Sequence, residues 1–379
     1  MIRVLHLARV VNRYDFIDTI VRHLPGDTFH MEVLTFEREA PIHPPKYEAV
    51  GIPHHVIPVR SLRSYPAYVK AGIKLSKLLR DRHIDILHAH HFWEGLTAAI
   101  AKLLHQRIRL ILHRHYTEDV IRIGGWKKRV LLGIERLSYS MADALIVPTQ
   151  MMAEIVAQWH AYLPPVHAIP YGFEFEAPKY KPLSEDERET IRAEYGANAQ
   201  AVVVVNVGTH RLQKGQRDLV QVFQAVEQEL PHLRLWLVGE GPDTPFLQRA
   251  CAQIKEKVRF FGWRSGTEVR QLMGAADIVV HPTYSEAFPQ VMIEALALER
   301  ALIITEVSGV KGILEHQEHA WIIPRGDTRA LYEGLRRLAQ DPPLRFSLGS
   351  KGRDFILKHF HYRQINPNYE SLYQHLCSR

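Results

Sequence analysis

The chain alternates short β-rich runs with helical patterns, and it does so twice. In the first half the β-rich runs lie at residues 2–7, 31–36, 54–58, 84–88, 109–113 and 144–147. In the second half they lie at residues 201–207, 234–238, 258–261, 278–281, 301–305 and 321–323. Most runs of the second set are continuously apolar, which is typical of strands buried on both faces of a sheet. Strand–helix–strand alternation of this kind favours parallel sheets with helices on both faces.

The join between the two halves is rich in proline. Five prolines lie between residues 164 and 182, and a charged run follows at residues 184–192. We therefore predict two doubly wound, Rossmann-like α/β domains that face a central cleft, one formed by residues 1–172 and one by residues 173–359. A C-terminal helix is also expected at about residues 360–379. Ligands of such domains bind beyond the carboxyl ends of the strands.

The composition excludes several classes of protein. Hydrophobic residues make up 46% and charged residues 23% of the 379 residues, so a chain that is mainly disordered is excluded. No apolar stretch approaches the roughly 18–20 residues that cross a bilayer. Cys251 and Cys377 are isolated and form neither a disulfide framework nor a zinc ribbon pattern. The reducing cytoplasm is the expected location.

The net charge of +7 lies entirely in the first half. Residues 1–172 hold 22 Lys and Arg against 15 Asp and Glu, whereas the remaining residues hold 26 of each kind. Residues 126–137 form an amphipathic, cationic pattern, and Lys70, Lys74 and Lys77 add to the basic surface. We expect this surface to contact anionic lipid on the inner face of a membrane, with a solvated helix face as the alternative. Nucleic acid is not expected, because no recognition motif accompanies the charge.

One basic loop follows the strand expected at residues 201–207. It runs from Gly208 to Gly215 and carries Arg211 and Lys214, which can reach a phosphate. The amino end of the following helix adds partial positive charge. The loop is not a Walker loop, and a solvated turn is the alternative interpretation.

Two glutamates follow the strand expected at residues 278–281. Pro289 is expected to be the first helical residue, so that the free N–H groups behind it bind a pyrophosphate. Glu286 precedes this helix, and Glu294 lies about 12 Å further along if the span is helical. That separation excludes an acid/base pair on one bond and suits hydroxyl groups at two ends of one long ligand. The alternative is that Glu286 caps the helix and Glu294 is solvated.

Histidines gather at the expected ends of two strands in the first half. His88, His90 and His91 follow one strand, and His113 and His115 follow the next. Such a group can form a metal site. However, no Asp or Cys stands at ligand spacing beside these histidines. Local hydrogen bonding, or one histidine that contacts a substrate, is therefore favoured over a metal.

These segments together resemble the retaining glycosyltransferases of the GT-B fold, family 4, also described as glycosyl transferases group 1. The resemblance covers nearly the whole chain and is strongest over residues 202–341. It also implies that the helix at about residues 360–379 packs back on the first domain, with packing on the second domain as the alternative. It rests on the loop Gly208–Gly215 and on Glu286 and Glu294, which match the Glu-x7-Glu pattern of the family. Further matching segments are residues 85–90, 142–149, 169–174, 237–242, 258–262 and 274–282.

The resemblance implies a reaction and the residues that carry it. It implies transfer of a sugar, expected to be a hexose, from a UDP- or GDP-sugar to a glycan or lipid-linked acceptor, in polysaccharide or glycolipid biosynthesis. The expected catalytic residues are His115, near the sugar and acceptor, Lys214, on the diphosphate, and Glu286, on the sugar hydroxyls. Glu294 is expected on the ribose. The remaining donor-binding residues are Arg211, Gly215, Trp263, Phe288, Pro289, Gln290 and Val291.

The chemistry implied by the resemblance needs no cofactor and no divalent metal. Fixed donors at Lys214, Arg211 and the helix amino end at residues 289–291 would stabilise the leaving diphosphate. The resemblance also implies same-face attack, with the departing phosphate taking the acceptor proton, and no carboxylate nucleophile is evident in the sequence.

The sequence departs from the family at two places. Thr209 stands where an arginine is common, and the stretch after the first strand lacks glycine. Arg9, Asn12 and Arg13 are therefore expected to contact the acceptor through their side chains. Two other functions stay open at this point, a sugar-nucleotide epimerase of the same fold and a degenerate protein that binds a sugar nucleotide as a partner subunit.

Overall fold

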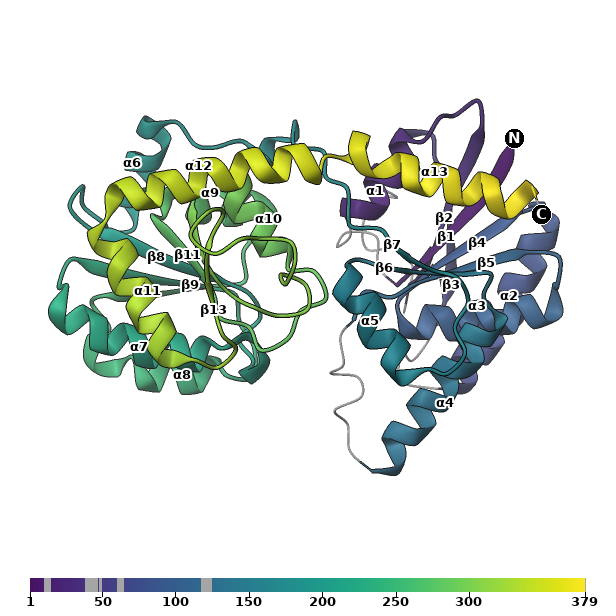
Figure 1. The fold of residues 1–379 in the computed structure, drawn as a ribbon, viewed down its shortest axis with the longest axis horizontal. Coiled ribbons are helices and arrows are strands. Elements are labelled where there is room, and N and C mark those ends of the chain that lie inside the picture. The colour runs from purple at the N-terminus through teal and green to yellow at the C-terminus, as the bar shows by residue number, and fades with distance from the viewer. Residues whose placement is uncertain (10–14, 38–46, 48–49, 60–64, 117–124, 379) are drawn as a thin grey trace. The chain divides into compact units, whose positions relative to one another are not determined.

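The computed structural model describes residues 1–9, 15–37, 47, 50–59, 65–116 and 125–378. The chain divides into two compact units, and each has its own parallel sheet (Figure 1). Unit 1 comprises Met1–Phe173 together with Phe360–Arg379, and unit 2 comprises Glu174–His359. The two doubly wound, Rossmann-like domains expected from the sequence are thus present.

Unit 1 is built on a seven-stranded sheet in the order β3-β2-β1-β4-β5-β6-β7, and all strands pair in parallel. The strands are β1 Ile2–Ala8, β2 Phe29–Glu37, β3 His54–Pro58, β4 Ile86–His90, β5 Arg109–His113, β6 Ala144–Val147 and β7 Val166–Ala168. The helices are α1 Asp15–His23, α2 Tyr65–Asp81, α3 Phe92–Leu104, α4 Trp126–Met141, α5 Gln150–Trp159 and α13 Tyr362–Ser378. Helices α1 and α13 cover one face of the sheet, and α2 and α3 cover the other (Figure 1).

Unit 2 is built on a six-stranded parallel sheet in the order β10-β9-β8-β11-β12-β13. The strands are β8 Val202–Val207, β9 Leu233–Val238, β10 Val258–Gly262, β11 Ile278–His281, β12 Ala301–Thr305 and β13 Trp321–Ile323. The α-helices are α6 Glu185–Glu194, α7 Gln216–Glu229, α8 Thr244–Ala250, α9 Gly266–Ala275, α10 Gln290–Ala297, α11 Thr328–Gln340 and α12 Pro342–His359. Three short 3-10 helices complete it, η4 Pro178–Tyr180, η5 Leu212–Lys214 and η6 Ala252–Ile254.

The apolar strands and helix faces form the core in each unit. Strand β8 is buried along Val202–Asn206, and the core of unit 2 joins it to Leu219 and Phe223 of α7 and to Leu335 of α11. Helix α13 packs in unit 1, where the Asn366 side chain donates a hydrogen bond to the Thr19 backbone carbonyl of α1. In the part of the chain that the structure describes, no helix is both long enough and apolar enough to cross a membrane.

Two local expectations are corrected. The strand expected at residues 84–88 is β4 Ile86–His90. Asp85 precedes this strand, and its carboxylate accepts the Arg3 backbone N–H at 2.8 Å. Pro289 is not the first residue of α10. It precedes the helix in an extended conformation, with ψ of 111°, and its carbonyl accepts the Met292 N–H at 3.1 Å.

Candidate functional site

Two strand-end loops of unit 2 lie against each other. The loop after β8 leads into η5 and ends at Gly215, whose φ is +70°. A Cβ at Gly215 would collide with the Pro282 carbonyl oxygen of the loop after β11, so both the conformation and the contact require glycine here. The Tyr284 N–H donates to the Gln213 carbonyl at 2.7 Å and holds the loops together.

This contact brings Lys214 and Glu286 together. The Lys214 Nζ donates to the Glu286 carboxylate in an ion pair, and both side chains are partly buried. The His281 Nε2 lies 3.4 Å from Glu286 Oε1. Burial alone would raise the pKa of Glu286, but His281 and the charge of Lys214 outweigh it and lower the pKa to about 2. The carboxylate is therefore ionised at neutral pH.

The amino end of α10 follows Glu286 directly. No side chain caps this helix end, because the residue before it is Pro289. Its first N–H groups, at Gln290 and Val291, carry the partial positive charge of the helix dipole, which favours an anion. Glu294 lies one turn along the same helix as Gln290, at the i,i+4 spacing that puts two side chains on one helix face. Phe288 is buried just before this helix end.

Two other predicted donor residues, Arg211 and Trp263, have exposed side chains. The Arg211 backbone carbonyl accepts the Lys214 N–H at 2.8 Å. Among the described residues, however, neither side chain forms a hydrogen bond or ion pair with Lys214 or Glu286. The sequence interpretation gave His281 no role, although its place as the last residue of a strand in front of Pro282 was visible. The structure thus brings Lys214 and Glu286 into contact and adds His281 to them.

A second group of side chains lies at the same edge of the sheet in unit 1. The strand register places His6 of β1 beside His88 of β4, and His90 of β4 beside His113 of β5. Residues two apart in a strand share one face, so these four histidines lie together. His6, His88, His90 and His113 are each at most 1% exposed. His115 follows β5 and completes what we call the histidine cluster.

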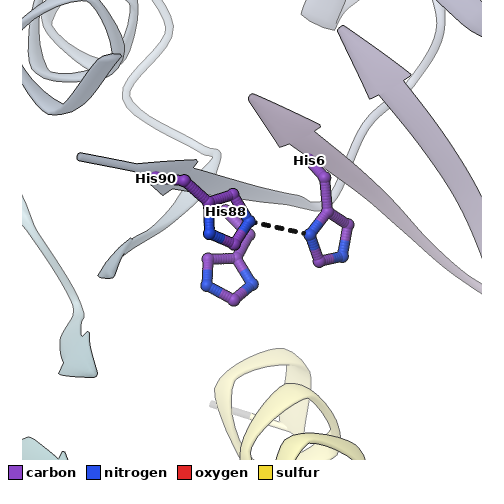
Figure 2. A group of neighbouring side chains, drawn as sticks. All are labelled: His6, His88 and His90. Carbon is purple, nitrogen blue, oxygen red and sulfur yellow. Dashed lines mark hydrogen bonds between the residues drawn. The ribbon is translucent and has the colours of Figure 1, made fainter. Parts of the chain in front are cut away.

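Hydrogen-bonding distances connect this histidine cluster to two tyrosines. His6 Nδ1 lies 3.0 Å from His90 Nε2 (Figure 2), and His90 Nδ1 lies 3.0 Å from His115 Nε2. The series continues from His115 Nδ1 to Tyr171 Oη at 2.6 Å. At its other end Tyr373 Oη lies 3.4 Å from His6 Nε2 and 2.7 Å from His88 Nδ1.

Burial keeps these imidazoles neutral. Desolvation lowers the pKa of His6 to about 3, and it lowers the pKa of His88, His90, His113 and His115 well below the usual value. Neutral imidazole nitrogens are the form of histidine that binds substrates as hydrogen-bond partners and binds metals as ligands.

His115, the expected catalytic histidine, thus belongs to a cluster rather than standing alone. The sequence interpretation did not include His6, Tyr171 or Tyr373 in this group. Arg9 is partly exposed just after β1, at the same edge of the sheet. Asn12 and Arg13, the other two expected acceptor contacts, lie outside the described residues.

Each of the two units matches a family model of known proteins. Residues 16–172 match the family model described as "Glycosyl transferase 4-like domain", and residues 187–355 match the one described as "Glycosyl transferases group 1". The chain belongs to the glycosyltransferases. The two matches meet near the boundary between the units, so each unit of this glycosyltransferase corresponds to one family domain.

Relatives of this glycosyltransferase include biosynthetic enzymes of bacteria. It is 25% identical to N-acetyl-alpha-D-glucosaminyl L-malate synthase of Bacillus anthracis over 83% of this chain and 81% of that protein. It is 22% identical to the capsular polysaccharide biosynthesis glycosyltransferase CapM of Staphylococcus aureus over 84% of each chain.

Solved structures share the fold of this glycosyltransferase. The HepE protein of Anabaena in complex with UDP-glucose has a TM-score of 0.80 at 21% identity, over 98% of this chain and 99% of that one. The sucrose-phosphate synthase of Thermosynechococcus elongatus has a TM-score of 0.81 at 19% identity over the whole of both chains. The fold is GT-B, as the sequence resemblance implied.

Proposed function

We propose that this glycosyltransferase moves a hexose from a UDP- or GDP-sugar to a glycan or lipid-linked acceptor, with retention of the anomeric configuration. The observation that carries the proposal is the Lys214–Glu286 ion pair in front of the uncapped end of α10. A diphosphate needs fixed positive charge, and a sugar needs hydrogen-bond acceptors for its hydroxyl groups. This corner of unit 2 offers both. The structure of HepE with UDP-glucose and the polysaccharide enzyme CapM support the same substrate class.

Donor binding would exchange partners within the ion pair. The ammonium of Lys214 leaves the Glu286 carboxylate and donates to the diphosphate, and the freed carboxylate accepts from hydroxyls of the sugar. The α10 N–H groups at Gln290 and Val291 add donors to the phosphate, and Glu294 accepts from the ribose hydroxyls. Because Lys214 and the helix end supply positive charge, we propose that the transfer itself uses no divalent metal.

The bond changes follow from same-face attack. The bond between the anomeric carbon and the diphosphate oxygen breaks, and a bond from the acceptor oxygen to the same carbon forms on the same face. The acceptor proton passes to the departing diphosphate. We assign His115 to the sugar and acceptor end of the site, and Arg9 to contact the acceptor.

A thermal-shift screen of UDP, GDP and their sugars tests the donor site. A ligand that binds the folded state raises the unfolding temperature. We expect one nucleotide to raise it equally in EDTA and in magnesium, and we expect Glu294→Ala and Lys214→Ala to abolish the increase. If wild-type protein responds to no sugar nucleotide, the donor site is absent. If it binds a donor but releases no nucleoside diphosphate with any glycan or lipid-linked acceptor, the transferase proposal is wrong.

We also propose that unit 1 docks peripherally on the cytoplasmic face of an anionic membrane. Helix α4 exposes Trp126, Val130 and Leu137, which are 71%, 42% and 51% exposed and recur at helical spacing. The side chains of Lys128 and Arg129 are exposed beside them. Exposed apolar side chains flanked by cations are typical of helices that lie in a membrane interface. A lipid-linked acceptor would be reached from such a position.

A further inference from the structure

The imidazoles of His90, His113 and His115 converge at the carboxyl ends of β4 and β5. One ligand nitrogen from each of the three lies within 4.8 Å of the other two. His90 Nδ1 and His115 Nε2 are 3.0 Å apart. Two nitrogens bound to one tetrahedral zinc ion at about 2.0–2.1 Å are separated by roughly 3.3 Å. The distance between His90 Nδ1 and His115 Nε2 is therefore close to the separation of two ligand nitrogens on one tetrahedral zinc ion.

His113 is the residue that hydrogen bonding leaves unexplained. It is 1% exposed, and neither of its ring nitrogens has a hydrogen-bond partner among the described residues. A buried polar group without a partner costs about 1–3 kcal/mol. The other members of the histidine cluster each have at least one partner.

We propose that His90, His113 and His115 bind one transition-metal ion of the zinc type. The ion gives His113 the partner that the protein itself does not supply. Imidazole ligands suit zinc, copper, nickel and cobalt rather than magnesium or calcium. The sequence favoured local hydrogen bonding over a metal here, and the geometry of His113 is the reason for the change.

The surroundings of two ligands fit this assignment. Metal-bound histidines usually donate their second ring N–H to a neighbouring acceptor, which fixes the tautomer. With the ion on His90 Nδ1 and His115 Nε2, the outward His90 Nε2–H donates to His6 Nδ1 (Figure 2). The outward His115 Nδ1–H donates to Tyr171 Oη. Both ligands thus have an outer acceptor in place.

A second triplet, His6, His88 and His90, also has its nitrogens within 4.8 Å of one another. In that triplet His6 Nδ1 is engaged by His90, and His88 Nδ1 is engaged by Tyr373. An ion there would leave both ring nitrogens of His113 without a partner, whereas an ion at His113 breaks only the contact between His90 and His115. We therefore assign the ion to His90, His113 and His115, with His6 as an outer acceptor.

The fourth coordination position would be open. His115 is partly exposed, whereas His90 and His113 are buried. No carboxylate or thiolate accompanies the three imidazoles in the metal-binding groups found among the described residues. The ion keeps its positive charge, so water, hydroxide or an anionic group of a ligand is the expected fourth ligand.

The test measures metal binding by tag-free, chelator-treated protein, with no sugar nucleotide present. We expect wild-type protein to bind one Co²⁺ per chain with a tetrahedral visible spectrum, and Zn²⁺ to displace it. His113→Asn should lower the affinity by about 100-fold or more, and His115→Gln should do the same. His88→Asn is the matched control, since it removes a buried histidine of the same cluster, and it should change the affinity less than about tenfold. Far-UV circular dichroism checks that each variant is folded.

Two outcomes overturn the proposal. If folded wild-type protein binds no stoichiometric Co²⁺ or Zn²⁺, the histidine cluster is a neutral hydrogen-bonded network only. If His88→Asn abolishes binding while His113→Asn keeps it, the ion belongs to the second triplet. The donor site in unit 2 takes no part in this measurement, so the metal site and the proposed transfer reaction can fail independently.

Discussion

The two units use the same edge of the same kind of sheet for opposite chemistry. In unit 2, the carboxyl ends of β8 and β11 carry an ion pair, Lys214–Glu286, in front of a helix end. In unit 1, the carboxyl ends of β1, β4 and β5 carry neutral imidazoles linked to one another and to two tyrosines. The fold supplies the position, and the residues at the strand ends decide what can bind there.

The net charges of the two halves of the chain show the reverse pattern. The first half of the chain holds the whole excess of +7, yet its strand-end group is neutral. The second half is balanced, yet its strand-end group is ionic. The net charge of a unit and the charge at its strand ends are therefore separate properties of this chain. Four measurements test this separation.

The largest expected effect is on transfer by Lys214→Ala. Removing one fixed donor from a leaving group typically costs 10²–10³-fold in rate, and we expect a loss of that order in kcat with any active donor. Lys257→Ala is the matched control, because Lys257 pairs with Glu227 in the same unit with similar exposure, before β10 rather than at a strand end. If both variants lose activity equally, the effect is loss of an ion pair and not of a phosphate donor.

The second effect is on stability as a function of pH. His281 and Lys214 lower the pKa of Glu286 to about 2, against 4.5 for the ordinary group. A depressed carboxyl pKa stabilises the folded state above about pH 4.5, and that stabilisation is lost as the pH falls toward 2. Glu286→Gln should therefore be less stable than wild type by about 3 kcal/mol at neutral pH.

The difference between wild type and Glu286→Gln should shrink as the solution is acidified. Urea unfolding of both proteins across the acidic range measures it. A difference that stays constant with pH would mean that Glu286 is not held ionised by its neighbours.

The third effect separates two histidines of unit 1 in the presence of a chelator. His90→Leu leaves His6 Nδ1 and His115 Nε2 without this partner, and a buried polar group left unpaired costs about 1–3 kcal/mol. His113→Leu removes a ring that has no hydrogen-bond partner among the described residues, so it should be neutral or stabilising. Thermal unfolding of the two variants makes the comparison. Equal destabilisation would show that packing of the rings, not their hydrogen bonding, holds this edge together.

The sequence was informative about which candidate residues follow a strand. Lys214 and Glu286 were both chosen because each follows a strand, and parallel strands end at one edge of a sheet. Their direct pairing could not be predicted, because it joins residues 72 positions apart through the contact of Gly215 with Pro282. Pro289 was placed one position too far into α10, since proline is also common just outside a helix.

The histidine cluster could be predicted only in part from the sequence. His88 and His90 stand two apart, which was visible, but His6 joins them only because β1 lies beside β4 in the sheet. Strand order is not contained in the local pattern. Tyr373 comes from the last helix, 367 residues from His6, and Tyr171 follows β7 within unit 1. Contacts of this range are set by packing rather than by periodicity.

The smallest expected effect concerns the surface charge of unit 1. If the excess positive charge of the first half binds an anionic membrane, each exposed cation of α4 should contribute up to about 1 kcal/mol to the binding of anionic vesicles. Lys128→Ala combined with Arg129→Ala should then weaken binding by at most about 30-fold, and added salt should weaken binding by the wild type in the same way.

The matched control is Arg249→Ala with Lys255→Ala, which removes two exposed cations from unit 2. Cosedimentation with phosphatidylserine vesicles measures all three proteins. If both double variants lose vesicle affinity equally, attraction depends on the total charge of the protein. If added salt does not weaken vesicle binding by the wild type, the cations of α4 are solvated and do not contact lipid.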